Sequence, residues 1–216
     1  MQKKYKRWEC GNDNIMNRMF VFGDSFVDNG NSNFLETVAN ADYLPYGMDF
    51  PLRPSGRYNN GKTFIDALGD LLNITAFIPP FFDPSTKGNH TIDGANYASS
   101  GSGILNETSS TLPPKQGCTT KEEGTAIDPI MKFLSFGDVK NPCCQVVSTE
   151  DGGNDTLCTK GGAMCKDRNQ FLFFDGLHPT EAVNVVLATK GFNSNLTSDV
   201  YPFSIRKFTE IWCHHL

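Results

Sequence analysis

The sequence predicts an α/β fold, because two apolar runs with the character of buried strands occur together with two amphipathic helical segments. The strand-like runs lie at residues 18–23 and 171–174, and each ends directly before a turn. The helical segments lie at 62–72 and 180–190, where apolar side chains recur along one side. Strands and helices that follow one another in this way are typical of α/β domains.

Length and charge limit the classes of protein to consider. A chain of 216 residues, 12% of them aromatic, is long enough for one packed domain and too short for two comfortable ones. Its net charge of −5 and pI of 5.3 supply no positive field for phosphate backbones, so nucleic acid is not an expected partner. No run of about 18 apolar residues occurs, and no membrane span is predicted.

The chain up to residue 60 is predicted to contain one strand. Residues 1–17 are polar and basic, and we expect them to lie outside the domain. The strand at 18–23 ends at Gly-Asp-Ser, which is typical of a tight turn. Residues 41–60 are rich in Pro, Gly and Tyr and are expected to form an ordered loop.

The helix predicted at 62–72 has one apolar side, formed by Phe64, Leu68, Leu71 and Leu72. Such a stripe is expected to pack on the rest of the domain. Asp66 and Asp70 lie four residues apart on the polar side of this helix, and we expect both carboxylates to face solvent.

The second half of the chain contains fewer clear signals. Small residues dominate 95–105, and they permit close approach of the backbone. The polar stretch at 106–138, interrupted by Pro and Gly, predicts no element. Pro179 suits the first position of the helix at 180–190, which makes His178 the expected N-cap.

Four of the seven cysteines are clustered, at Cys143, Cys144, Cys158 and Cys165. Their spacing fits no zinc-binding pattern, so disulfides are predicted, with the connectivity left open. Because the number of cysteines is odd, at least one thiol is left over, and we expect it among Cys10, Cys118 and Cys213.

The density of N-glycosylation sequons favours a secreted protein. Five sequons occur, at Asn73, Asn89, Asn106, Asn154 and Asn195. The N-terminus as written has no apolar segment of the kind found in a secretory leader. We therefore expect a secreted protein with possible N-glycans at these positions, although the chain as written carries no signal peptide.

Three residues on loops after the two strands could act together in catalysis. Ser25 follows the first strand, and Asp175 and His178 follow the second. A separation of three residues lets the Asp175 carboxylate reach Nδ1 of His178, which leaves Nε2 to take a proton from a hydroxyl. Either motif alone is more often a structural turn or helix cap. Together they favour nucleophilic acyl transfer.

Five longer motifs surround these residues: MFVFGDSFVDNGN at 19–31, PYGMDFP at 45–51, GRYNNG at 56–61, ANYASSGSGIL at 95–105 and FFDGLHPTEA at 173–182. They resemble successive blocks of the plant GDSL esterase/lipases, a branch of the SGNH hydrolases. Phe26 stands where the family name has Leu. The resemblance covers about 18–108 and 138–208.

The resemblance implies a three-layer, SGNH-type (flavodoxin-like) fold, in which a parallel sheet is flanked by helices, and a single hydrolase domain over 1–216. It implies that Ser25 is the nucleophile, that His178 is the general base and then the acid, and that Asp175 orients His178. The backbone N–H of Ser25 and Gly101 would donate to the oxyanion. No metal and no organic cofactor is implied.

The resemblance also predicts that the fold is incomplete. The family has a central Gly-x-Asn-Asp block whose Asn donates to the oxyanion, and the stretch at 106–138 stands in place of that central segment. The same letters occur at 152–155, but they lie inside the cysteine-rich stretch and overlap a sequon. We therefore interpret Asn154 as a loop residue and not as an oxyanion donor.

The leading hypothesis is a secreted serine esterase/lipase that hydrolyses carboxylic esters of lipid or acyl type through an acyl-serine intermediate. Its expected partner is a small-molecule ester or lipid. One alternative is a truncated, weakly active or inactive variant, because loss of one oxyanion donor costs about 10²–10³ in kcat and missing strands leave open sheet edges. Another is a scaffold that only binds lipid or glycan.

Overall fold

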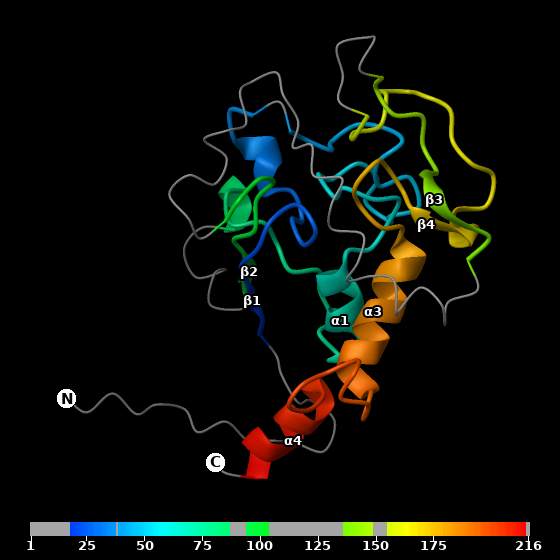
Figure 1. Cartoon of the computed structure of the whole chain (residues 1–216). Helices are drawn as coiled ribbons and strands as arrows, with labels where there is room; N and C mark the ends of the chain where they lie inside the picture. Colours follow the sequence, from blue (N-terminus) through cyan, green and yellow to red (C-terminus); the bar gives the residue numbers. More distant parts are fainter. Residues whose placement is uncertain (1–17, 38, 87–93, 104–135, 149–154, 215–216) are drawn as a thin grey trace.

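The computed structural model describes residues 18–37, 39–86, 94–103, 136–148 and 155–214 (Figure 1). Outside these ranges lie the N-terminal stretch, most of the 106–138 stretch, Cys10, Cys118, Asn89, Asn106 and Asn154. The expectations for them, and the single domain over 1–216 that includes them, stay predictions.

The described strands form two separate two-stranded sheets, and both are parallel. Strand β1 (Phe20–Val21) pairs with β2 (Ala95–Asn96), and β3 (Asp138–Pro142) pairs with β4 (Phe171–Phe173). In register, Phe20 lies opposite Ala95, and Asp138 lies opposite Phe171. The predicted α/β class is therefore confirmed. One sheet covered by helices in three layers stays a prediction.

Strand β1 is buried on one face only, whereas the sequence predicted a buried strand. Val21 is 4% exposed, but Phe20 is 51% exposed and Phe22, directly after the strand, is 76% exposed. Phe22 stacks on Tyr97 with ring centroids 5.0 Å apart. Because side chains alternate along a strand, Phe20 and Phe22 lie on the face opposite Val21, and that face is the exposed one.

Helix α1 (Phe64–Leu71) confirms the helix predicted at 62–72. The helix begins after Thr63, whose hydroxyl oxygen accepts from the N–H of Asp66 while the Asp66 carboxylate accepts from the N–H of Thr63. This reciprocal capping box satisfies two backbone donors at the start of the helix. The start of α1 is thus encoded by two residues three positions apart.

Helix α3 (Glu181–Asn193) packs beside α1, and α4 (Ile205–His214) packs against α3 (Figure 1). Short 3₁₀ helices lie at η1 (Asn31–Phe34), η2 (Pro84–Thr86) and η4 (Arg168–Gln170). In the part of the chain that the structure describes, none of the helices combines the length and the apolar character that a bilayer crossing needs.

Helix α3 starts later than predicted, because its N-cap is Thr180 and not His178. The chain after β4 folds back on that strand. The N–H of Phe174 donates to the carbonyl of His178 at 2.8 Å, and the N–H of Thr180 donates to the carbonyl of Leu172 at 3.0 Å. These bonds close a tight turn, so His178 is held at the end of the strand and the helix begins only after the turn.

The core consists of two hydrophobic clusters. The first packs β1 against α1 and α3 and includes Val21, Leu68 and Phe192. The second surrounds the cysteine-rich segment and includes Tyr46, Tyr58 and Phe174. Ser25 lies on the turn after β1, whose Val21 belongs to the first cluster. Asp175 directly follows Phe174, which belongs to the second cluster. The two clusters thus supply the two sides of the candidate site.

Two disulfides cross-link the second cluster, as the clustered cysteines predicted. Cys143 pairs with Cys165, and Cys144 pairs with Cys158. Both bonds lie within one segment of the chain, and three of the four cysteines are fully or almost fully buried. Loops closed by such bonds lose chain entropy in the unfolded state, which stabilises the folded state.

Asp66 is buried in an ion pair, which contradicts the expected solvent exposure. Its carboxylate accepts from Nε of Arg57 at 2.7 Å and from Nη2 at 2.9 Å, and both residues are less than 5% exposed. Asn29 donates to the same carboxylate at 3.1 Å. Asp70 is exposed as expected and pairs with Lys62. The polar side of the helix is therefore covered at Asp66 by the loop that carries Arg57.

We expect Asp66→Ala to lower the free energy of unfolding by about 3–5 kcal/mol, because it leaves the Arg57 guanidinium buried without its carboxylate. Urea denaturation measures this loss. Asp70→Ala is the matched control on the same helix, and it should cost less than about 1 kcal/mol because its pair is exposed. Equal losses for the two variants would contradict the burial argument.

Candidate active site

Ser25 lies on a tight turn that follows β1 directly. The N–H of Val27 donates to the carbonyl of Asp24 at 3.3 Å, and the N–H of Phe26 donates to the Asp24 carboxylate at 3.0 Å. A Cβ at Gly23 would lie 2.6 Å from a methyl carbon of Val27, so a larger residue there would displace the Val27 side chain. Ser25 itself is partly exposed. The turn therefore lifts its hydroxyl out of the core at the carboxyl end of the strand.

Asp28 anchors the chain after this turn, a role that the sequence analysis missed. Its buried carboxylate accepts from the N–H groups of Gly30 and Asn31 at 2.7 Å, from the Ser32 hydroxyl at 2.6 Å and from the N–H of Ser100 at 3.2 Å. Burial raises the pKa of Asp28, and the hydrogen bonds from Ser32, Gly30 and Asn31 act in the opposite direction. One carboxylate thus ties the loop after β1 to the loop after β2.

Asp175 and His178 are brought together by the turn after β4. Nδ1 of His178 lies 3.0 Å from Oδ1 and 2.9 Å from Oδ2 of Asp175. The N–H groups of Leu177 and His178 also donate to Oδ1, at 2.9 and 2.7 Å. Asp175 is fully buried and His178 is 5% exposed. The carboxylate is therefore an acceptor for the Nδ1 proton, which leaves Nε2 as the basic nitrogen.

Nε2 of His178 faces Ser25 from the other hydrophobic cluster. The distance between Nε2 and Oγ of Ser25 is 2.8 Å, although 153 residues separate the two in sequence. The ring of Tyr58 packs on the imidazole with centroids 4.9 Å apart. A hydroxyl, an imidazole and a carboxylate are thus aligned in one hydrogen-bonded chain, which can activate the hydroxyl oxygen as a nucleophile.

Tyr46 extends this chain beyond the carboxylate, and the sequence analysis gave it no role. Its hydroxyl donates to Oδ2 of Asp175 at 2.6 Å and accepts from the N–H of Cys158 at 3.0 Å. Burial raises the pKa of Tyr46 well above its usual range, and the negative charge of Asp175 adds to the effect. In the sequence, the signal that could have pointed to Tyr46 was its place in the PYGMDFP motif.

Gly101 lies on the loop that follows β2. Because β1 and β2 are parallel, their carboxyl ends lie at the same edge, and the N–H of Ser99 donates to the carbonyl of Gly23 at 3.2 Å. Gly101 has a φ of 75°, a conformation that favours glycine. The loop of Gly101 is thus bonded to the turn that carries Ser25. Its role as an oxyanion donor stays a prediction, and Asn154 lies outside the described residues.

Comparison with known families agrees with the motifs. The model of the GDSL-like lipase/acylhydrolase family matches residues 19–156, which is more than half of the chain. The chain belongs to this family. The resemblance to plant GDSL esterase/lipases that the motifs predicted is therefore confirmed. Membership of the GDSL-like lipase/acylhydrolase family supports ester hydrolysis in general.

Curated GDSL relatives from Arabidopsis thaliana match only parts of this chain. GDSL esterase/lipase At1g71250 is 59% identical over 87 residues, which are 40% of this chain and 23% of that protein. At5g08460 is 53% identical over 42% of this chain and 23% of its own length, and At1g33811 is 40% identical over 54% and 31%. The matched segments thus span about a quarter to a third of these relatives. No solved structure matches the chain.

Proposed function

We propose that this chain is a serine esterase/lipase that hydrolyses carboxylic esters of lipid or acyl type through an acyl-serine intermediate, with Ser25, His178 and Asp175 as its catalytic residues. The observation that carries the proposal is the 2.8 Å contact between Oγ of Ser25 and Nε2 of His178, with Nδ1 of the same ring held by Asp175. Membership of the GDSL-like family supports the reaction class.

In the proposed reaction, Oγ of Ser25 attacks the ester carbonyl carbon as its proton moves to Nε2 of His178. The imidazolium then gives this proton to the departing alkoxide, which leaves as the alcohol. Water attacks the acyl-serine with the same imidazole as base, and the acid is released with the serine restored. Asp175 stabilises the positive charge on the ring in both steps.

The oxyanion formed in each step needs donors. We propose the backbone N–H groups of Ser25 and Gly101 for this role, because the turn after β1 and the loop after β2 are bonded to each other at the same sheet edge. Each such donor contributes about 2.7–4 kcal/mol to the stability of the transition state. The substrate carbonyl is accordingly expected to lie between these two loops.

We also propose that the protein is secreted and N-glycosylated. Disulfides persist in oxidising compartments, and two buried disulfides lie in the second cluster. The two sequon asparagines in the described residues, Asn73 and Asn195, are both exposed and so are accessible to a glycan.

A fluorophosphonate probe tests the catalytic proposal. The probe should form a phosphonyl ester at Oγ of Ser25 with loss of fluoride, and peptide mass mapping should find the adduct on that residue. Heat-denatured protein is the control and should not be labelled, because the imidazole no longer lies beside the hydroxyl. Absence of labelling in the folded protein would overturn the proposal and favour the inactive variant or the lipid-binding or glycan-binding scaffold.

A further inference from the structure

We infer that Tyr46 is a positioning residue for the proposed ester hydrolysis, and that its hydroxyl orients the Asp175 carboxylate toward the imidazole of His178. This inference rests on the proposed function and adds a fourth side chain to the three that carry out the reaction. Tyr46 touches neither Ser25 nor, in the proposed mechanism, the substrate. It acts through Asp175.

Each oxygen of the Asp175 carboxylate has its own donors. Oδ1 accepts from the backbone N–H groups of Leu177 and His178, within the turn itself. Oδ2 accepts from the hydroxyl of Tyr46, which is 129 residues away in sequence. With one oxygen held by the turn and the other held by Tyr46, rotation of the carboxylate plane is restricted. Such support keeps a reacting group in its productive geometry.

The direction of the Tyr46 O–H bond follows from the donors around it. Its oxygen already accepts from the N–H of Cys158 at 3.0 Å, and a backbone N–H cannot accept a proton in return. The hydroxyl proton therefore points at Oδ2 of Asp175, 2.6 Å away. Because burial raises the pKa of Tyr46, the phenol stays protonated and remains a donor across the working pH range.

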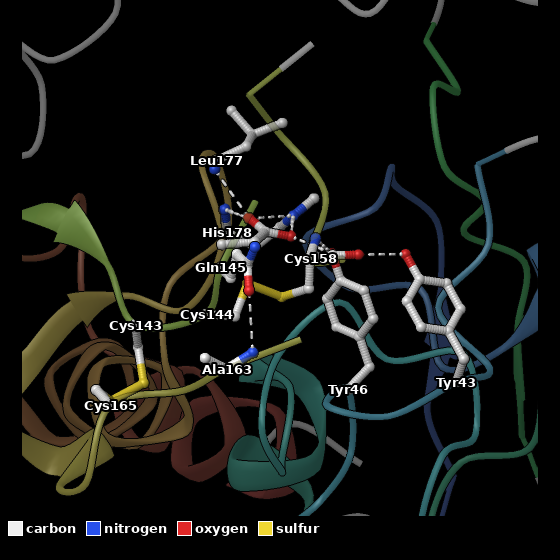
Figure 2. The surroundings of a disulfide bond; sticks show 11 residues. Tyr43, Tyr46, Cys143, Cys144, Gln145, Cys158, Ala163, Cys165, Leu177 and His178 are labelled. Atoms are coloured by element: carbon white, nitrogen blue, oxygen red, sulfur yellow. Dashed lines mark hydrogen bonds and ion pairs between the residues drawn. A yellow bond between two sulfur atoms is a disulfide. The ribbon is translucent and has the colours of Figure 1, made fainter. Parts of the chain in front are cut away.

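The phenol ring itself is held by the disulfide-linked segment (Figure 2). Cys158, which donates to the Tyr46 hydroxyl, is bonded to Cys144, and the N–H of Cys144 donates to the carbonyl of Phe174 at 2.9 Å. Phe174 directly precedes Asp175. The same cross-linked segment thus fixes both the residue before the carboxylate and the side chain that donates to it.

The charge on Asp175 gives the inference a measurable signature. The titratable groups around it are His178 and the phenols of Tyr43, Tyr46 and Tyr58. The negative charge of Asp28 contributes to a raised pKa of Tyr58, and that of Asp42 contributes to a raised pKa of Tyr43. Removing the Tyr46 donor leaves more negative charge on the carboxylate oxygen that faces the imidazole, which favours the protonated ring.

Tyr43 provides a matched control. Its hydroxyl donates to the carbonyl of Cys158 at 2.9 Å, and its ring lies edge-on to that of Tyr46 with centroids 5.3 Å apart (Figure 2). Tyr43→Phe and Tyr46→Phe therefore each remove one hydroxyl and one bond to the backbone of the same residue. Only Tyr46→Phe removes a donor from Asp175.

We expect Tyr46→Phe to lower kcat for a p-nitrophenyl ester about tenfold with KM unchanged, since the Asp175 carboxylate is no longer held in the plane that orients the imidazole. The acidic limb of its kcat/KM profile should move to higher pH. The rate constant for phosphonylation of Ser25 should fall by a similar factor. Tyr43→Phe should leave all three quantities within about twofold of the parent protein.

The outcomes separate the inference from the proposed function. If the parent protein is labelled at Ser25, and Tyr46→Phe shows the same labelling rate constant and the same pH profile as the parent protein, the inference is overturned and the function stands. If the parent protein is not labelled, the function fails first. The urea denaturation curve of Tyr46→Phe gives its folded fraction, and the observed labelling rate constant is divided by that fraction before the two proteins are compared. A variant that only loses folded protein therefore also contradicts the inference.

Discussion

Ser25→Ala is expected to lower kcat for ester hydrolysis by about 10⁶-fold, because it removes the oxygen that lies 2.8 Å from Nε2 of His178. Among the described residues, no other hydroxyl forms a hydrogen bond with Nε2 of His178. The methyl group of alanine fits the space of the serine side chain, so urea denaturation should give a free energy of unfolding within about 0.5 kcal/mol of the parent value. Labelling by the fluorophosphonate probe should disappear.

Ser85→Ala is the control for this variant. Ser85 is exposed, and its hydroxyl donates to the side chain of Asp83. It should hydrolyse a p-nitrophenyl ester at the parent rate. If Ser25→Ala retained a rate similar to that of Ser85→Ala, the nucleophile would have to be another residue and the proposed mechanism would be wrong.

The sequence could predict the three proposed catalytic residues because each lies in a short local signal. Ser25 follows an apolar strand, and the spacing of Asp175 and His178 lets them meet within one turn. Helix α1 was predicted almost to its ends for the same reason, since the apolar stripe that indicates it is contiguous in sequence. What one turn of chain encodes can be read from the sequence alone.

Partners that are distant in sequence could not be predicted. Asp66 was assigned to solvent because its helix position is polar, but the loop that carries Arg57 covers it. Tyr46 meets Asp175 because Tyr46 and Phe174, the residue before Asp175, pack together with the disulfide-linked cysteines in the second cluster. No local sequence pattern predicts a contact between two residues so far apart in the chain. In the sequence, Arg57 and Tyr46 were members of the GRYNNG and PYGMDFP motifs, and the spacing of these motifs did not indicate which side chains they contact.

The start of α3 shows a third kind of limit. Pro179 suits a first helical position, but here the residue pairs with Phe173 in an isolated bridge. Backbone hydrogen bonds to β4 therefore delay the helix to Glu181 and keep His178 in the turn. A local helix rule was overridden by strand contacts. The consequence is that His178 presents its ring to the site, where an N-cap residue would present its side chain to the helix start.

Asp175→Asn is expected to lower kcat by about 10⁴-fold while the protein stays folded. The amide oxygen can still accept from the N–H groups of Leu177 and His178, so the turn is retained. The amide nitrogen then stands at the position of Oδ2, which faces both the Tyr46 hydroxyl and Nδ1 of His178, and it is a donor where an acceptor is needed. Opposite Nδ1 it favours the tautomer that carries its proton on Nε2, which cannot take the proton of Ser25.

Asp167→Asn is the matched control for this substitution. Asp167 also accepts from a backbone N–H two residues on, that of Asn169 at 3.0 Å, but it is exposed and caps a 3₁₀ helix. It should leave kcat unchanged. The decisive measurement is kcat and Ser25 labelling for both variants beside their urea denaturation curves. Full activity in a folded Asp175→Asn would show that the carboxylate is only a turn cap, and loss of activity in Asp167→Asn as well would show that the effect is not specific to the imidazole.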